Sequence, residues 1–324
     1  ADLRVMLYRD EWAGFDPENS RADFAIRGNV RADEDAIKIV VQLESTASGE
    51  LLWSNASKAI ADESQLIGFQ EKTAAIVAAH VAGEHGLVAQ NMAARAANRP
   101  DRYQSNYDAI LKGYAYHQKI EPDVYLQAYG ALKEAQARDG SCGLVCTMLA
   151  LIYVDNISLE FFDIGETPLA EAIRLAREGV RLLPENQLSR IALARVHLLD
   201  NNIEAGLREL ETLQAQAPNS VLCMDLAGYL FALFGDWDRG VQLVLRAAEL
   251  NPFYRLLTRY ALWYNRFRQG PYEEALWETL WLAGVGFFWD PLVRATTLGQ
   301  LGRRDESQAA VTELLHMKPD FALR

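Results

Sequence analysis

The sequence predicts a mainly α-helical fold: a solenoid of about six stacked helix pairs, preceded by a small α+β domain. Three observations predict this fold. Pro184, Pro218 and Pro252 follow one another at intervals of 34 residues, and a fixed period of this size is typical of stacked helical repeats. Small residues recur at fixed positions within the period. Residues 1–63 differ, because they consist of short hydrophobic runs bounded by turn residues.

The first element is a small antiparallel sheet over residues 1–63. Its runs are LRVMLYR, FAIRGNVR, AIKIVVQLES and LLWSNASK, and the segments RADEDA and TASGE between the last three have the length of hairpin loops. Residues 64–100 follow with apolar residues three and four positions apart, which indicates a helix. We expect this helix to cover one face of the sheet and to lead into the repeats.

The helix pairs are predicted from the recurrence of small residues. If each of the three prolines is repeat position 32, then positions 8 and 20 hold Ala150, Ala194, Gly228, Ala172, Gly206 and Gly240. We expect two helices to approach most closely at these positions, where only small side chains fit. With this register the sequence resembles the tetratricopeptide-repeat family over residues 104–319.

Two irregularities interrupt the repeats. An insertion at about residues 154–167 contains Phe161 and Phe162, and a loop this long and apolar is expected to fold over a neighbour or meet a partner. The fifth pair has one extra residue near Gly270 and Pro271. The sixth pair closes at Pro319, and residues 320–324 are expected to be a tail with an incomplete carboxy-terminal cap.

The amino-terminal module also resembles a known pattern. Gly28 and Val30 of the GNVR turn, Leu43 of VQL, Gly49 of the hairpin and Trp53 match the TolB-like αβ domain. That domain precedes tetratricopeptide repeats in bacterial class III adenylate or guanylate cyclases and in winged-helix transcription regulators. The resemblance implies a regulatory half of a bacterial signalling protein. The cyclase core and the basic recognition helix are absent, so no catalytic residue is carried over.

Composition narrows the function classes. Half of the 324 residues are hydrophobic and the formal net charge is −12, which argues against a broad nucleic-acid-binding surface. The sequence has no apolar run of about 18 residues, the length of a membrane span, and its start lacks the features of a signal peptide. We therefore expect a cytoplasmic chain, with the periplasmic part of a membrane-tethered regulator as the alternative.

Motifs for catalysis, cofactors and metals are not found. The sequence has no phosphate-binding loop, GxGxxG turn, HExxH, GxSxG or paired CxxC. His80 and Glu84 are four residues apart, but such a pair is more often a solvated helix face than a metal site. Cys142 and Cys146 are expected to be small buried hydrophobes. The sequence therefore predicts no enzyme activity, no cofactor and no metal.

The candidate binding residues lie on the first helix of each pair, which lines the concave face of a solenoid. In the register above, the predicted groove residues are Tyr107, Tyr114, His117, Arg195, Asp225, Tyr229, Arg259, Trp263, Arg266 and Trp289. Arg259, Trp263 and Arg266 share a helix face and are suited to an acidic or aromatic group. A register error of one residue would instead place Trp263 in packing between repeats, and this alternative stays open.

These features predict a non-catalytic regulatory module that binds a peptide segment, or another copy of the chain, in the concave groove. The alternative is a small-molecule sensor that controls a cyclase or DNA-binding output domain, with its pocket in the aromatic groove or under the 154–167 insertion. A third class, an enzyme with an unrecognised site, needs converging titratable groups that the sequence does not show.

Overall fold

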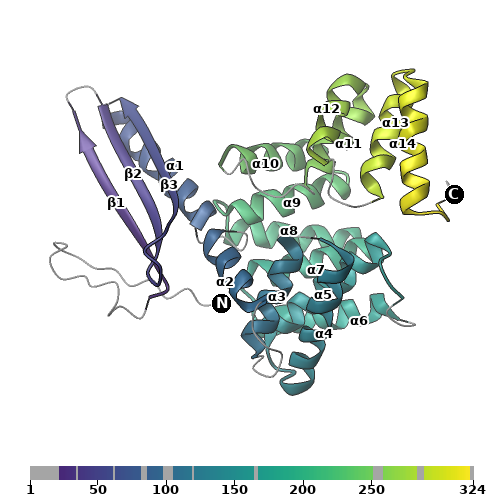
Figure 1. Cartoon of the computed structure of the whole chain (residues 1–324), viewed down its shortest axis with the longest axis horizontal. Helices are drawn as coiled ribbons and strands as arrows, with labels where there is room; N and C mark the ends of the chain where they lie inside the picture. The colour runs from purple at the N-terminus through teal and green to yellow at the C-terminus, as the bar shows by residue number, and fades with distance from the viewer. Residues whose placement is uncertain are drawn as a thin grey trace. The chain divides into compact units, whose positions relative to one another are not determined.

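The computed structural model describes residues 22–33, 36–60, 63–81, 86–97, 105–118, 120–163, 167–250, 258–282 and 288–321. The chain divides into two compact units, Ala1–Arg95 and Ala96–Arg324, and each is treated by itself (Figure 1). The predicted run LRVMLYR, the residue Glu84 and the end of the predicted tail lie outside the described residues. The domain limits 1–63, 64–100, 104–319 and 320–324 stay predictions.

The first unit contains a three-stranded antiparallel sheet in the order β1-β2-β3. The strands are β1 (Phe24–Ala32), β2 (Ala36–Ser45) and β3 (Leu51–Ile60). The register pairs Val30 with Ile39 and Leu43 with Trp53, and a bulge follows at Glu44. The predicted meander of the FAIRGNVR, AIKIVVQLES and LLWSNASK runs is therefore confirmed.

Two helices accompany the sheet, α1 (Glu63–Val81) and α2 (Leu87–Ala97). Leu43 of β2, Val81 and Val88 form a buried core to which Trp53 is added from β3, and the Trp53 ring stacks on His80 at 5.3 Å. The helices therefore cover the face of the sheet that carries Leu43. Because side chains alternate along a strand, Lys38, Gln42 and Glu44 of β2 lie on the opposite face.

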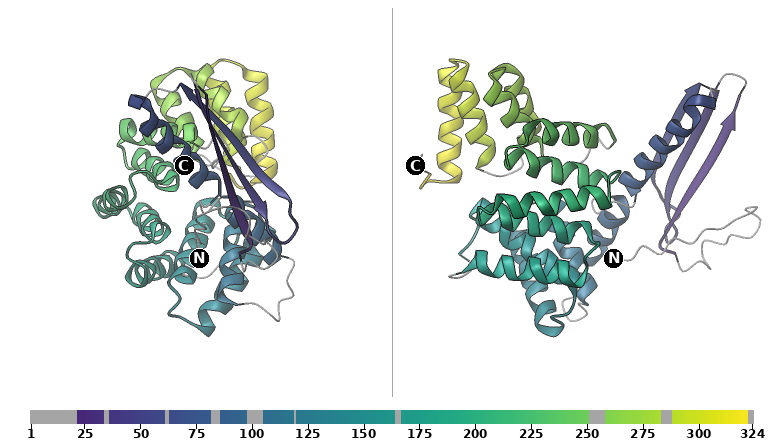
Figure 2. Two further views of the ribbon diagram at one scale, coloured as in Figure 1. Left: turned by 90° about the vertical axis from the view of Figure 1, so that its left-hand side faces the viewer. Right: turned by 180° about the vertical axis from the view of Figure 1, so that it is seen from behind.

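The second unit is built of six antiparallel helix pairs within the described residues (Figures 1 and 2). The first helices of the pairs are α3 (Asn106–Gln118), α5 (Gly143–Leu159), α7 (Gln187–Leu199), α9 (Val221–Leu233), α11 (Arg259–Gln269) and α13 (Trp289–Gln300). The second helices are α4 (Pro122–Arg138), α6 (Pro168–Leu182), α8 (Ile203–Gln216), α10 (Trp237–Leu250), α12 (Tyr272–Leu282) and α14 (Arg304–Met317). This arrangement confirms the predicted solenoid.

Local sequence signals set several helix boundaries. The side chains of Asn186, Asn202 and Ser220 accept hydrogen bonds from the backbone nitrogen three residues further on, which caps α7, α8 and α9. Pro122 and Pro168 stand at the start of α4 and α6, where a missing N–H costs no helical hydrogen bond.

The small residues of the repeat lie where the helices of a pair meet. Ala150, Ala172 and Ala194 are fully buried. A Cβ atom at Gly240 of α10 would lie 2.5 Å from the carbonyl oxygen of Gly228 in α9. The expectation that positions 8 and 20 mark the closest approach of two helices is thus correct for this pair.

The insertion between α5 and α6 folds back onto α5 and onto α4 of the preceding pair. Asn156 donates its side-chain amide to the Phe162 carbonyl oxygen at 2.7 Å and accepts from the Phe162 backbone nitrogen at 3.0 Å. The rings of Phe161 and Phe162 lie 5.9 and 5.4 Å from the ring of Tyr125 in α4. Of the two outcomes expected for this loop, the described part shows the one in which it covers a neighbour.

Candidate functional site

Three successive first helices bring a base, an acid and an arginine together. His117 of α3 lies 3.6 Å from the Asp155 carboxylate of α5, measured from Nε2 to Oδ2. Arg195 of α7 donates from an Nη atom to the other carboxylate oxygen of Asp155 at 2.5 Å. His117 and Asp155 are buried, whereas the Arg195 side chain keeps 20% of its surface exposed. Arg195 is therefore the member of the cluster with the largest exposed fraction.

The charges of this cluster support each other. Burial by itself would raise the pKa of Asp155, but Arg195 and then His117 outweigh it and hold the pKa of that carboxyl well below its usual range. Asp155 is thus a carboxylate at neutral pH. Because its charge balances that of Arg195, the pair adds almost no net charge to the surface.

Arg195 retains unused hydrogen-bonding capacity. A guanidinium group has five N–H donors, and among the described residues the only acceptor of Arg195 is Asp155. The exposed part of the side chain can therefore donate to a ligand without releasing Asp155. A planar fork of this kind is suited to a carboxylate.

Two tyrosines, Tyr116 and Tyr229, lie near the Asp155–Arg195 ion pair. Burial raises the pKa of Tyr116, which is fully buried on α3, and the Asp155 charge adds to the increase. Burial also raises the pKa of Tyr229 on α9, which the Arg195 charge opposes. Tyr229 keeps part of its surface exposed. The arginine fork is therefore bordered by an aromatic side chain that can contact an apolar group of a ligand.

The arginines of the fifth pair are occupied by the chain itself. Arg259 and Arg266 of α11 each lie 3.2 Å from a carboxylate oxygen of Glu278 in α12, and Arg266 also contacts Glu274. The Arg259 guanidinium lies 4.5 Å from the centre of the Trp281 ring. These contacts brace α11 against α12, so the acidic group expected as a ligand here is supplied internally.

Trp263 is a packing residue. Its side chain is buried with Ala275, Leu282 and Val293, and its indole N–H donates to Thr297 Oγ1 of α13 at 2.9 Å. This corrects the placement of Trp263 on the groove face, and it agrees with the alternative in which the residue joins neighbouring repeats. The physical reason is the size of the indole ring, which reaches the neighbouring helices α12 and α13.

The remaining predicted groove residues are dispersed. Tyr114 and Asp225 are buried, Tyr107 is partly buried, and Trp289 is exposed and stacks on Phe288 at 5.2 Å. Among the described residues, the structure joins His117, Arg195 and Tyr229 of the predicted set in one cluster, and it joins Arg259 and Arg266 through Glu278 in another. Burial corrects the placement of Tyr114 and Asp225 on an open groove surface.

Sequence reasoning missed Asp155, the residue that joins the cluster. It lies outside the repeat positions used to choose groove residues. A signal was nevertheless present, because Asp155 follows the apolar run LVCTMLALIYV in α5. A carboxylate in such a run must have a charged or hydrogen-bonding partner.

A second surface was also missed. Trp277, Leu280 and Trp281 of α12 are 68%, 63% and 56% exposed, and their spacing places them on one helix face. Both tryptophans belong to the second helix of the fifth pair. Contiguous exposed apolar surface of this kind marks interaction sites.

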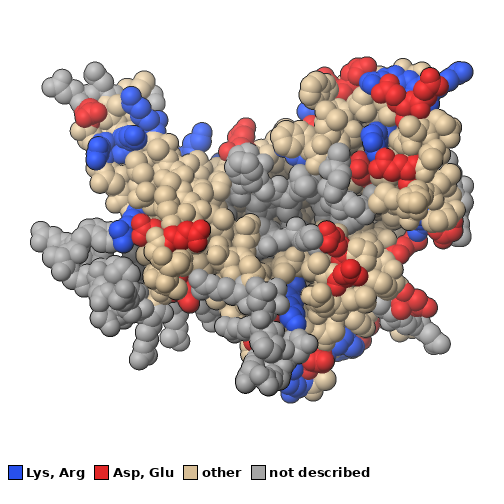
Figure 3. Space-filling model, in the orientation of Figure 1, with Lys and Arg blue, Asp and Glu red and all other residues tan. Residues whose placement is uncertain are grey.

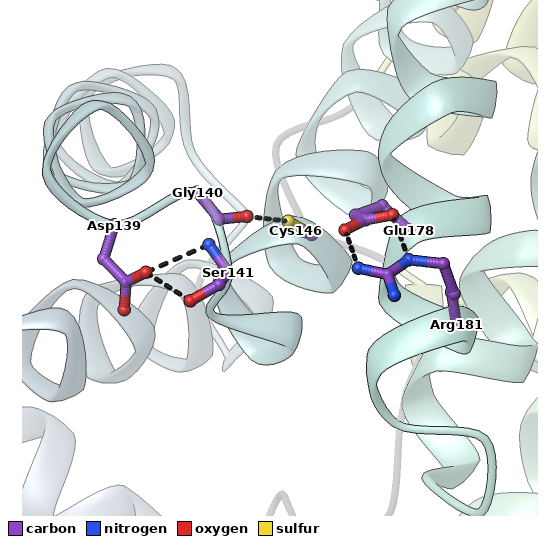
Figure 4. A network of polar contacts seen from close by, with 6 residues as sticks. All are labelled: Asp139, Gly140, Ser141, Cys146, Glu178 and Arg181. Carbon is purple, nitrogen blue, oxygen red and sulfur yellow. Dashed lines mark hydrogen bonds and ion pairs between the residues drawn. The ribbon is translucent and has the colours of Figure 1, made fainter.

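Cys146 is a buried thiol, whereas Cys142 is partly exposed. Cys146 donates from Sγ to the Gly140 carbonyl oxygen at 3.7 Å (Figure 4). Burial and then the charge of Glu178, which is paired with Arg181 at 2.6 Å, raise the pKa of Cys146. A protonated, buried thiol is a poor nucleophile, which agrees with the expectation that Cys146 is a small buried hydrophobe.

In the part of the chain that the structure describes, no three His, Cys, Asp or Glu side chains lie close enough to hold a metal ion. None of the described helices has the length and apolar character needed to cross a membrane.

Comparison with known proteins shows the fold. No family model and no curated protein matches the sequence. The human IFIT1 dimer with m7Gppp-AAAA is similar in structure, with a TM-score of 0.58, 17% identity, and coverage of 71% of this chain and 54% of that chain. The Cut9–Hcn1 hetero-tetramer of the APC/C is also similar in structure, with a TM-score of 0.52, 14% identity, and coverage of 76% of this chain and 46% of that chain.

Both neighbours are tetratricopeptide-repeat proteins, and the fold of the second unit is a solenoid of this type. The matched part of each is about half of that chain. At these identities the likeness concerns the fold alone.

Proposed function

We propose that this chain is a non-catalytic protein–protein interaction module, which binds a peptide segment along the first-helix face of its solenoid. In this proposal, Arg195 recognises the peptide by binding one of the carboxylate groups of that peptide. The observation that carries the proposal is the partly exposed side chain of Arg195, whose guanidinium group is held by buried Asp155 and makes no other hydrogen bond among the described residues.

Hydrogen-bond geometry, more than net charge, gives this site its specificity. Asp155 neutralises Arg195, so long-range attraction of anions is weak. A carboxylate that reaches the free side of the guanidinium gains paired N–H donors that are already oriented. Tyr229 beside it favours an apolar or aromatic residue next to the acidic one.

The neighbours use the same architecture for different ligands. The IFIT1 structures contain m7Gppp-AAAA or PPP-AAAA, and Cut9 is bound to Hcn1. In this chain the net charge of −12 and the internal pairing of Arg259 and Arg266 favour a protein segment over RNA along the solenoid.

The wider role follows from the resemblance of the amino-terminal module to TolB-like domains. We place the chain in the regulatory part of a bacterial, cytoplasmic signalling protein whose output is a cyclase or a DNA-binding domain. A small-molecule sensor of the same output is the alternative. It would show stabilisation by a metabolite in place of peptide binding.

The test compares two arginines of α7. Labelled peptides that differ only in Asp or Glu against Asn or Gln are titrated by fluorescence anisotropy. We expect acidic members to bind the wild type, and Arg195→Lys to weaken binding about tenfold, because lysine keeps the charge beside Asp155 but lacks the fork. Arg190→Lys is the matched control, since Arg190 pairs with Glu209 of α8. Unchanged binding by Arg195→Lys would contradict the proposal.

A second candidate function, self-association, is favoured by the exposed surface of Trp277, Leu280 and Trp281. Two largely exposed indole rings and a leucine give a few hundred Å² of apolar area, which is the size of patches that mark interfaces. Packed against its own copy, such a patch supplies the apolar core of an interface of about 1,200 Å² or more in total.

Self-association is expected to depend on these rings. The double variant Trp277→Ser and Trp281→Ser should shift the mass measured by light scattering from dimer to monomer at micromolar concentration. Leu245→Ser on α10 is the control, because Leu245 is also exposed but lies on another helix. A wild-type chain that stays monomeric over the whole concentration range refutes this candidate.

A further inference from the structure

A row of three cations crosses the sheet of the first unit. Arg31 of β1 stands directly opposite Lys38 of β2, and Lys38 stands directly opposite Lys58 of β3. All three side chains are exposed. Lys38 and Leu43 are five residues apart on one strand, so the row lies on the face opposite the one that α1 and α2 cover.

The row destabilises the sheet, so a contribution to folding stability does not explain why the three cations are present. Like charges directly opposite each other in neighbouring strands are destabilising. In the described part of the chain, none of the three cations has an ion-pair partner, whereas Arg27 on the same face pairs with Glu44 at 3.0 Å. Acidic residues outnumber basic ones by 44 to 32, so the chain does not lack acids to neutralise the row.

A hollow adjoins the row. It has a volume of about 350 Å³ and is lined by Asn29, Arg31, Lys38 and Val40. Asn29 stands opposite Val40 in the register, so an amide side chain and one apolar side chain line this open hollow together with two cations. Figure 3 shows Lys and Arg side chains gathered over the upper part of this sheet.

We infer that this face of the sheet binds a linear oligophosphate, of the kind that a nucleoside triphosphate or inorganic polyphosphate carries. Neighbouring strands are about 4.8 Å apart, so the three cations span about 10 Å. Such a row matches a chain of phosphate groups better than a single carboxylate. Arg31 contributes a fork suited to phosphate oxygens, and Asn29 supplies an uncharged donor at the edge.

The inference is independent of the peptide site, because it concerns the other unit. Phosphate groups also occur on lipids, and this source is distinguished experimentally. A free oligophosphate requires binding in solution that increases with the number of phosphate groups. A lipid surface requires binding to vesicles without that dependence.

The experiment titrates the full chain with orthophosphate, pyrophosphate and tripolyphosphate by calorimetry, and with vesicles that contain phosphatidic acid by sedimentation. We expect affinity to rise from orthophosphate to tripolyphosphate and to fall with added salt. Lys38→Gln, which removes the central cation, should weaken tripolyphosphate binding at least tenfold. Lys72→Gln on α1 is the control, since Lys72 is exposed but outside the row.

A second readout separates the proposal from general charge effects. Without ligand, Lys38→Gln should raise the Tm slightly, because it relieves repulsion with Arg31 and Lys58. With tripolyphosphate the wild type should gain Tm and the variant should not. Equal binding by Lys38→Gln and wild type, or binding to vesicles only, overturns the inference.

Discussion

Replacing Gly240 with alanine is expected to lower the free energy of unfolding by about 3 kcal/mol or more, the upper end of the cost of overpacking. A Cβ atom at this position would lie 2.5 Å from the Gly228 carbonyl oxygen and 2.6 Å from the Ala232 backbone nitrogen. Both obstacles are backbone atoms of α9, which no change of rotamer can move. The helices α9 and α10 must therefore separate, and the contacts along the pair weaken together. Urea unfolding followed by circular dichroism measures the loss.

Gly130→Ala provides the matched comparison. Gly130 lies inside α4, and a Cβ atom there has nothing within 4 Å. Alanine is the better helix former, so this variant should be more stable than wild type by about 0.5–1 kcal/mol. If Gly240→Ala also leaves stability unchanged or improved, the close approach of α9 and α10 at that position is wrong.

The solenoid was predictable because its signals are local and periodic. Gly240 is small because α9 and α10 meet there, and small residues recur at the same repeat position every 34 residues, at Gly206 and Ala172. The turn segments likewise predicted the meander of the sheet. The close contact within a helix pair and the position of a hairpin turn can therefore be predicted from a short stretch of sequence.

The candidate site was less predictable because it depends on contacts across repeats. Asp155 and Arg195 are 40 residues apart and meet only when α5 and α7 stack. Trp263 was placed on the groove face by the repeat register, whereas its ring is buried against α12 and α13. One residue of error turns a helix by about 100°, which is enough to exchange a surface position for a buried one.

The repeat pattern in the sequence also did not predict which residues of the second helices are exposed. Trp277 and Trp281 have the composition of core residues, and the sequence does not show that the outer face of α12 lacks a covering element among the described residues. The same is true of the cation row, since Arg31, Lys38 and Lys58 align only through the register of two hairpins.

The second large effect is expected from Arg195→Ala, which should lower the free energy of unfolding by about 3–5 kcal/mol. The variant leaves Asp155 buried without its arginine, and desolvation of that carboxylate is then only partly offset by His117. Asp155→Asn should cost less, because Arg195 is 20% exposed and can be solvated when its partner is removed. Arg195→Ala is therefore expected to lose more stability than Asp155→Asn, because the Asp155 carboxylate that it leaves behind is more deeply buried than Arg195.

Lowering the pH should reduce the difference in the free energy of unfolding between the wild type and Arg195→Ala. In the wild type the pKa of Asp155 is below its unfolded value, which is about 3.9. Its stabilising contribution is therefore complete above about pH 4 and is lost as the pH falls further. In Arg195→Ala burial raises the pKa of Asp155, so protonation relieves the penalty and the variant gains stability as the pH falls. Urea unfolding at pH 7 and below pH 4 tests this convergence.

The double variant Arg195→Met and Asp155→Leu separates stability from recognition. Replacing both charges with apolar side chains removes the buried carboxylate and the need to balance it, so the double variant should recover most of the stability that Arg195→Ala loses. Peptide binding should not recover, because the fork is gone. A double variant that regains binding together with stability would show that the His117–Asp155–Arg195 cluster serves the fold alone.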